Sequence, residues 1–199
     1  MEQKEAIKER ILKAAMELLE TEGDVPGVSM RRIARRADVA VSMINYHYQS
    51  KDNLMVQAVE RYIAGVIGAS SGEGGQEDSG TIDGMRKHLK RAAAFVALNP
   101  GISRVSIFQD LEKGSANDNS SRIASSVLQS LRKIYGERKS ETELKLLAFM
   151  QVAAVQQLFL RAEVFFQETG LDFFKAPDRD RIADMIIDIV AAAAERSET

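Results

Sequence analysis

Four arginines stand close together near the N-terminus and give this stretch the chemistry of an anion-binding surface. They are Arg31, Arg32, Arg35 and Arg36. With Lys51, and against Asp38 alone, they give residues 29–51 a local net charge of +4. The whole chain has a formal net charge of −2, so the remaining residues carry −6. A basic patch on an acidic chain favours binding to a polyanion such as DNA, although an ordinary solvated helix face has the same composition.

Two short helices are expected to position these residues. Apolar residues of the segment 29–37 recur at the spacing of one helix face: Met30, Ile33, Ala34 and Ala37. Ser29 can cap this helix, because its hydroxyl can accept a free amide hydrogen of the first turn. The segment 40–48 has Ile44 and Tyr48 to face inward. The two segments meet at a tight break near Asp38, and this pattern predicts a helix-turn-helix.

The residues that follow complete a pattern that resembles the tetracycline-repressor (TetR) family of bacterial transcription regulators. The pattern comprises Asn45-Tyr46-His47-Tyr48, Ser50-Lys51 and Leu54, with Ala6-Ile7, Arg10-Ile11-Leu12, Ala14-Ala15 and Leu18 before it. It covers roughly the first 55 residues, and Asp38 departs from it where the family usually has glycine. The resemblance implies a three-helix DNA-binding head, followed by a helical domain that binds a ligand and forms a dimer.

Contacts to base edges and contacts to phosphates would come from different residues of this head. The outward face of the second helix would read bases with Val41, Ser42, Met43 and Asn45. Asparagine can pair bidentately with adenine, whereas valine and methionine can only contact a thymine methyl group, so DNA shape is expected to matter. Phosphates would be bound by Ser29, Arg31 or Arg32, Tyr46, His47 and Lys51. The alternative for Tyr46 and His47 is packing of the turn.

The rest of the chain is expected to be helical throughout. Helical patterns cover residues 3–22, 50–67, 81–97, 102–113, 120–135, 141–168 and 178–195. With the two short helices of the head this makes about nine helices and an all-α fold. Residues 68–80 are rich in glycine and serine and predict a flexible loop. We expect a DNA-binding domain at residues 1–50 and an effector-binding and dimerisation domain at residues 51–199.

Two of these segments, 141–168 and 178–195, are apolar on more than one side. A terminal helix with two apolar sides needs a second partner, which a two-fold homodimer supplies. The four helices of two chains would then form the interface. The alternative is ordinary burial of both sides within one chain.

The resemblance implies a pocket for a small-molecule effector among the helices of the second domain. The candidate lining residues are Phe95, Arg104, Phe108, Met150, Gln151 and Phe159. Their aromatic and apolar character favours a large apolar effector. An anionic group would be indicated if Arg104 or Arg161 were buried. Plain core packing explains each apolar residue equally well.

Other functional classes find little support in the composition. The chain has no cysteine and two histidines, and it offers no metal-ligand spacing and no phosphate-binding glycine loop, so we expect no enzyme activity, metal or cofactor. No apolar run is long enough for a membrane span, and the charged start is unlike a signal peptide. A cytoplasmic bacterial protein is therefore expected.

These patterns together predict a ligand-responsive regulator, most simply a repressor. It would bind a palindromic double-stranded DNA operator as a dimer and be released or shifted by an effector. One alternative is an architectural or protein-recruiting DNA-binding protein without a small-molecule switch. Another is a small-molecule binder that is indifferent to DNA.

Overall fold

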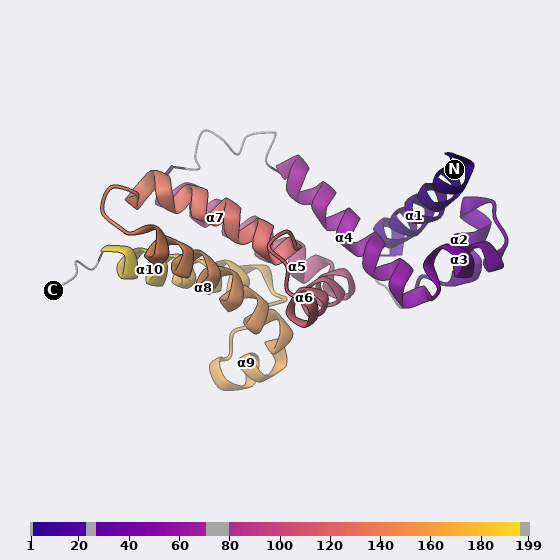
Figure 1. The fold of residues 1–199 in the computed structure, drawn as a ribbon. Coiled ribbons are helices and arrows are strands. Elements are labelled where there is room, and N and C mark those ends of the chain that lie inside the picture. Colours follow the sequence, from indigo (N-terminus) through magenta and orange to yellow (C-terminus); the bar gives the residue numbers. More distant parts are fainter. Residues whose placement is uncertain (1, 23–26, 71–79, 196–199) are drawn as a thin grey trace. The chain divides into compact units, whose positions relative to one another are not determined.

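The computed structural model describes residues 2–22, 27–70 and 80–195, and these form ten helices and no strand (Figure 1). The all-α prediction is confirmed. The chain divides into two compact units, Met1–Gly68 with Asn99–Gly114, and Ala69–Leu98 with Ser115–Thr199. The first unit thus includes most of the helix that follows residue 50. The predicted domain boundary at that residue stays a prediction.

The first unit, called the head below, contains five helices. They are α1 (Glu2–Glu22), α2 (Met30–Ala37), α3 (Val41–Tyr48), α4 (Lys51–Ser70) and α6 (Pro100–Lys113). The first four contribute fully buried side chains to its core, among them Ile11, Leu19, Ile33, Ile44 and Leu54. α2 packs on α1 and on α3. The apolar stripe predicted for each short helix is therefore the face that the head buries.

The turn between α2 and α3 depends on a left-handed residue. Asp38 has φ 51° and ψ 56°, and the amide of Val39 donates to the carbonyl of Ala34 at 3.0 Å. Arg10 of α1 reinforces the turn, because its Nη2 donates to the carbonyls of Ala37 at 2.5 Å and Asp38 at 2.9 Å. These bonds satisfy carbonyls that the end of a helix leaves free. The predicted helix-turn-helix is confirmed.

Replacing Asp38 with glycine is expected to stabilise the protein. Glycine adopts a left-handed backbone without steric cost, so the free energy of unfolding should rise by about 0.5–1 kcal/mol. Arg10 donates to the backbone carbonyl of residue 38, and glycine keeps that carbonyl. Urea denaturation measures the change. Asp38→Ala is the control, because it removes the carboxylate and keeps the strained Cβ; an equal gain in both variants would contradict the explanation.

The second unit, called the body below, contains the other five helices. They are α5 (Ile82–Leu98), α7 (Asn119–Tyr135), α8 (Glu141–Leu160), α9 (Ala162–Thr169) and α10 (Ala176–Glu195). α8 packs against α7 and α10, and α10 packs against α5. Its fully buried side chains include Leu131, Leu144, Phe159 and Phe173.

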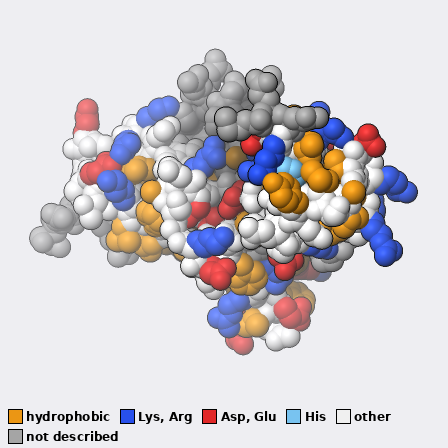
Figure 2. Space-filling model, turned by 45° about the vertical axis from the view of Figure 1, so that its right-hand side comes forward, with side chains coloured by type: hydrophobic (Ala, Val, Ile, Leu, Met, Phe, Trp, Pro, Cys, Tyr) orange, Lys and Arg blue, Asp and Glu red, His pale blue; other side chains and the backbone are white. Residues whose placement is uncertain are grey.

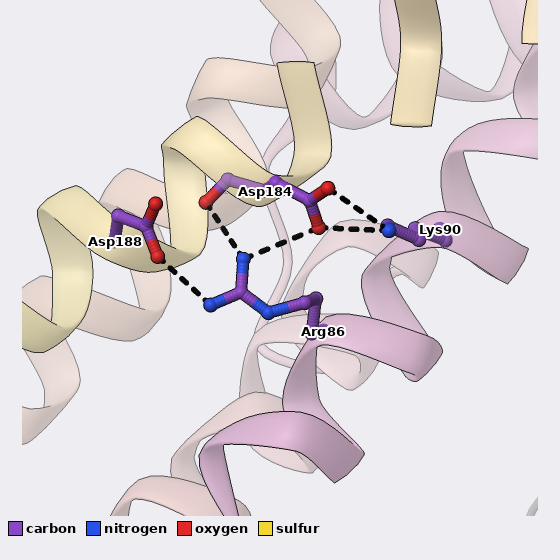
Figure 3. Close-up of polar contacts among 4 residues, drawn as sticks. All are labelled: Arg86, Lys90, Asp184 and Asp188. Atoms are coloured by element: carbon purple, nitrogen blue, oxygen red, sulfur yellow. Dashed lines mark hydrogen bonds and ion pairs between the residues drawn. The ribbon is translucent and has the colours of Figure 1, made fainter. Parts of the chain in front are cut away.

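Charged side chains also join α5 to α10 (Figure 3). Arg86 contacts Asp184 at 3.2 Å and Asp188 at 2.8 Å, while Lys90 contacts Asp184 at 2.8 Å. The hydrogen bond from Lys90, followed by that from Arg86, lowers the pKa of the Asp184 carboxyl. Two cations therefore face two carboxylates across this helix pair, and their charges cancel.

The prediction of one continuous helix over 141–168 is wrong, and the break makes ten described helices where about nine were predicted. Arg161, at φ −114° and ψ 27°, leaves the helical conformation and separates α8 from α9. After α9 the chain returns so that Phe173 and Phe174 lie with their ring centroids 6.0 and 6.2 Å from that of Phe159. The apolar rhythm continues across the break, which is why periodicity alone missed it. The predicted start of the loop is also wrong, because α4 extends to Ser70; residues 71–79 lie outside the described part.

Both α8 and α10 expose apolar side chains in addition to their buried faces. These side chains are Leu146, Phe149, Met150, Met185 and Ile189. Ile189 is 63% exposed. By length and composition α8 could cross a membrane, a criterion that the core helices of other proteins also meet. In the body, however, its opposite face packs on α7 and α10. The sequence predicts a partner chain on these same two helices.

The start of α8 is held by a capping box that should make stability depend on pH. The Glu143 carboxylate accepts from the hydroxyl of Ser140 at 2.7 Å and from its amide at 2.9 Å, and Lys139 donates to it at 3.1 Å. These bonds, that from the Ser140 hydroxyl first, lower the pKa of Glu143 from 4.5 to about 2.

A lowered carboxyl pKa stabilises the folded chain above the unfolded pKa of 4.5. This stability is lost as the pH falls toward the folded value of about 2. The difference in free energy of unfolding between the wild type and Glu143→Gln should therefore shrink over that range. Urea titrations at several pH values measure it. A difference that does not change with pH would contradict the role given to the ionised carboxylate.

Candidate nucleic-acid interface

The four arginines of α2 form two pairs with different surroundings. Arg32 donates to Glu22 at 2.5 Å and to the carbonyl of Gly27 at 3.1 Å, and Arg36 donates to Glu17 at 2.6 Å. The hydrogen bond from Arg32 lowers the pKa of the Glu22 carboxyl. Both arginines thus tie α2 to the second half of α1, which makes them positioning residues within the head.

Arg31 and Arg35 form the other pair, one turn apart on α2. Both are exposed, and neither makes a hydrogen bond or an ion pair with any residue in the described ranges. At this i, i+4 spacing the two side chains are neighbours on the surface of the helix. Figure 2 shows Lys and Arg side chains on the surface around a group of hydrophobic ones. The cations of α2 that are free to meet a polyanion are therefore these two.

The predicted base-reading residues lie on the outer side of α3. Val41, Ser42 and Asn45 are exposed and Met43 is half-buried, while Ile44 and Tyr48 on the other side are fully buried. Ala40 provides no side-chain cap, so the first turn of α3 keeps free amide hydrogens. This face presents one amide, one hydroxyl and two apolar side chains.

The corner between α3 and α4 fixes the direction of the outer face of α3. The Tyr48 hydroxyl donates to the carbonyl of Lys8 at 2.9 Å, and the Tyr48 carbonyl accepts from the amide of Ser50 at 2.8 Å and from Asn53 Nδ2 at 3.0 Å. Burial raises the pKa of Tyr48 to about 12, so its hydroxyl stays a donor at neutral pH. Gln49 at the corner has φ 66°, a strained conformation for a residue with a side chain.

α4 begins directly after this corner and presents a cation at its N-terminus. The Ser50 hydroxyl accepts from the amide of Asn53 at 3.1 Å and so caps the helix. Lys51 is half-buried and has no partner among the described residues. Its ammonium and the free amides of the first turn can face the same anion.

Tyr46 and His47 are adjacent aromatic residues on α3, and the structure adds a lysine to them. Their ring centroids are 5.2 Å apart with edge-to-face geometry. Tyr46 is 64% exposed, and Lys4 Nζ of α1 lies 4.9 Å from its ring centroid. His47 Nε2 is buried without a hydrogen-bond partner among the described residues. Sequence reasoning missed Lys4, because the cation–π contact joins residues 42 positions apart.

Ser29, predicted to bind a phosphate, serves as the cap of α2. Its hydroxyl accepts from the amide of Arg32 at 3.3 Å, while the residue itself remains exposed. A hydroxyl that accepts one hydrogen bond can still donate its own hydrogen. The cap role and a phosphate contact are therefore compatible.

The six candidate effector residues occupy different environments. Gln151 and Phe159 are buried on one face of α8, and Gln151 Oε1 has no partner among the described residues. Met150 lies on the exposed side of α8, and Phe95 is half-buried in α5. Arg104 and Phe108 are exposed on α6, which belongs to the head. Their role in binding an effector stays a prediction. No group of three potential metal ligands occurs in the described ranges.

Comparison with known proteins points to one family. Residues 11–58 match the family described as bacterial regulatory proteins, tetR family. An uncharacterized HTH-type transcriptional regulator in the dhlA 5' region of Xanthobacter autotrophicus is 48% identical over 54 residues, which are 27% of this chain and 26% of that protein. The match thus spans about a quarter of that relative's length. The crystal structure of a TetR transcriptional regulator from Rhodococcus sp. RHA1 has a TM-score of 0.53 and 20% identity, over 96% of this chain and 98% of that one, which indicates a shared fold.

Proposed function

The chain is a transcriptional regulator of the TetR family, and on that premise we propose that it is a ligand-responsive repressor that binds a palindromic operator as a homodimer. The observation that carries the proposal is that Arg31 and Arg35, on the helix that precedes an exposed α3, have no partner among the described residues. Free cations beside a helix with exposed polar side chains suit the major groove and its flanking phosphates.

In this proposal the residues of the head divide into three groups. Phosphates are bound by Ser29, Arg31, Arg35, Tyr46, His47 and Lys51, with Lys4 beside Tyr46. Bases are read by Val41, Ser42, Met43 and Asn45. Arg32 holds α2 in place through Glu22, so its loss would weaken binding by loosening the head.

The dimer is proposed to form through the exposed apolar faces of α8 and α10. Five large apolar side chains that meet water in one protomer would be buried against their counterparts in the partner. Two heads held in this way can enter successive major grooves, about 34–36 Å apart, on one side of the DNA. An effector that shifted α4 would change this spacing and release the operator. We place the protein in the bacterial cytoplasm, where the operator is.

A mobility-shift assay on the DNA upstream of its own gene tests the proposal. The full chain should form one discrete complex at low salt, and the logarithm of the association constant should fall linearly with that of the salt concentration. An unrelated DNA fragment of equal length is the control. Equal affinity for both fragments would count against operator recognition, and absence of any complex at low salt would overturn the DNA-binding role.

A further inference from the structure

Arg179, in the first turns of α10, is a buried cation without a counter-ion. The residue is 6% exposed, and no carboxylate in the described parts of the chain pairs with it. The nearby acids have other partners: Asp178 accepts from the amide of Asp172 at 3.1 Å, and Asp172 pairs with Lys175 at 3.6 Å. An uncompensated charge in a protein interior is costly.

Three other cations of the body that are partly or fully buried pair with carboxylates. Arg86 has Asp184 and Asp188, and Lys90 shares Asp184 (Figure 3). Lys139, with a side chain 9% exposed, pairs with Glu143. Arg179 is on the same helix as Asp184, yet it has no such partner. Unlike these three cations, Arg179 has no counter-charge among the described residues.

One edge of the Arg179 guanidinium is free. Its Nη1 donates to the carbonyls of Phe173 at 3.3 Å and Phe174 at 3.2 Å. Its Nε is buried without a partner, and its Nη2 makes no hydrogen bond to a described residue. The Nε and Nη2 hydrogens are two parallel donors, and this is the geometry that a carboxylate accepts bidentately.

Arg179 is bound to a cluster of phenylalanines, because the carbonyls of two of them accept from its Nη1. Phe173, whose carbonyl binds Arg179, has its ring centroid 6.0 Å from those of both Phe159 and Phe174. Phe159 and Phe173 are fully buried, whereas Phe174 is 46% exposed. Of the three rings, that of Phe174 is the one open to solvent, so a ligand that reached Arg179 would meet it first.

We propose that the Nε–Nη2 edge of Arg179 binds the carboxylate of an effector whose apolar part packs against the exposed ring of Phe174. The sequence analysis expected an anionic effector if Arg104 or Arg161 were buried, but both are exposed. The burial expected there is found at Arg179, a residue that the sequence analysis did not select. As a statement about the effector, the inference rests on the proposed function.

Benzoate and its neutral isostere benzamide provide the test on the full chain. Benzoate should raise the melting temperature and move the Nε–H resonance of Arg179 in a ¹H–¹⁵N spectrum, and benzamide should do neither. Arg179→Gln should weaken benzoate binding roughly 10- to 100-fold, the effect of losing hydrogen bonds to a charged group. Arg122→Gln, which removes an exposed arginine of α7, should leave it unchanged.

Arg179→Gln also removes the hydrogen bonds to the carbonyls of Phe173 and Phe174, so it can destabilise the fold. If it does not fold, Arg179→Lys keeps the cation but loses the forked edge, and the resonance test on the wild type needs no variant. The proposal is overturned if benzoate, octanoate and acetate leave that resonance unmoved, or if benzamide and benzoate act alike. Arg179 would then be a structural clip for the Phe173–Phe174 turn.

Operator binding separates this inference from the function on which it rests. If benzoate binds at Arg179 and the mobility shift does not change, the binding site is supported and its regulatory role is excluded. A chain that binds benzoate and never binds DNA would overturn the proposed repressor alone. Intact, operator-specific DNA binding with no carboxylate bound would overturn the inference alone.

Discussion

Replacing Arg31 and Arg35 together with glutamine is expected to weaken operator binding at least about 100-fold at near-physiological salt. Neither side chain has a partner in the described structure, so the substitution leaves the packing of the head as it is. A plot of the logarithm of the association constant against the logarithm of the salt concentration should become less steep by about 0.9 for each phosphate that the protein no longer neutralises. Two substitutions in each protomer of a dimer give a change of about 3.6. Mobility shifts over a salt series measure both quantities.

Two comparisons make this prediction specific. Arg91→Gln with Arg122→Gln removes the same charge from exposed positions on α5 and α7, and should change the slope little. Arg32→Gln breaks the ion pair with Glu22, so it should lower the melting temperature as well as the affinity. Equal weakening by the body pair and the head pair would show that net charge matters and the position of the cations does not.

Replacing Ile189 with glutamate is expected to produce a monomer that no longer binds the operator at concentrations where the wild type is bound. The side chain is 63% exposed in the single chain, so the substitution should cost the protomer little. In a dry interface between two copies the same carboxylate would lie buried and unpaired, at a cost of several kcal/mol per protomer. Sedimentation should therefore change from twice 22.0 kDa to 22.0 kDa.

Leu98→Glu is the matched control for this variant. Leu98 is 75% exposed at the end of α5, outside the proposed interface, and its replacement should leave the dimer intact. The melting temperatures of both variants show whether the protomer fold survives. A wild-type chain that sediments at 22.0 kDa and still binds its operator tightly would contradict the dimer.

Local sequence patterns predicted the first three helices of the head within one or two residues. The stripe that includes Ile33 is buried, Ser29 caps α2, and Asp38 takes the left-handed conformation at the turn. Each of these depends on residues a few positions apart, so a short window of sequence contains the information. The break at Arg161 was missed for the converse reason. No glycine or proline marks it, and the aromatic contacts that accompany it come from residues 173 and 174.

The sequence by itself determined the all-α fold, the helix-turn-helix and the local charge of +4, because periodicity, capping and charge are local properties. Only the tertiary structure decided which arginines are free. Glu17 and Glu22 of α1 pair with Arg36 and Arg32, whereas Arg31 and Arg35 have no partner among the described residues. The tertiary structure likewise left Arg179 buried, with no carboxylate partner in the described part of the chain. Ion pairs between helices depend on how the helices pack, and that arrangement is not contained in any short segment of the chain.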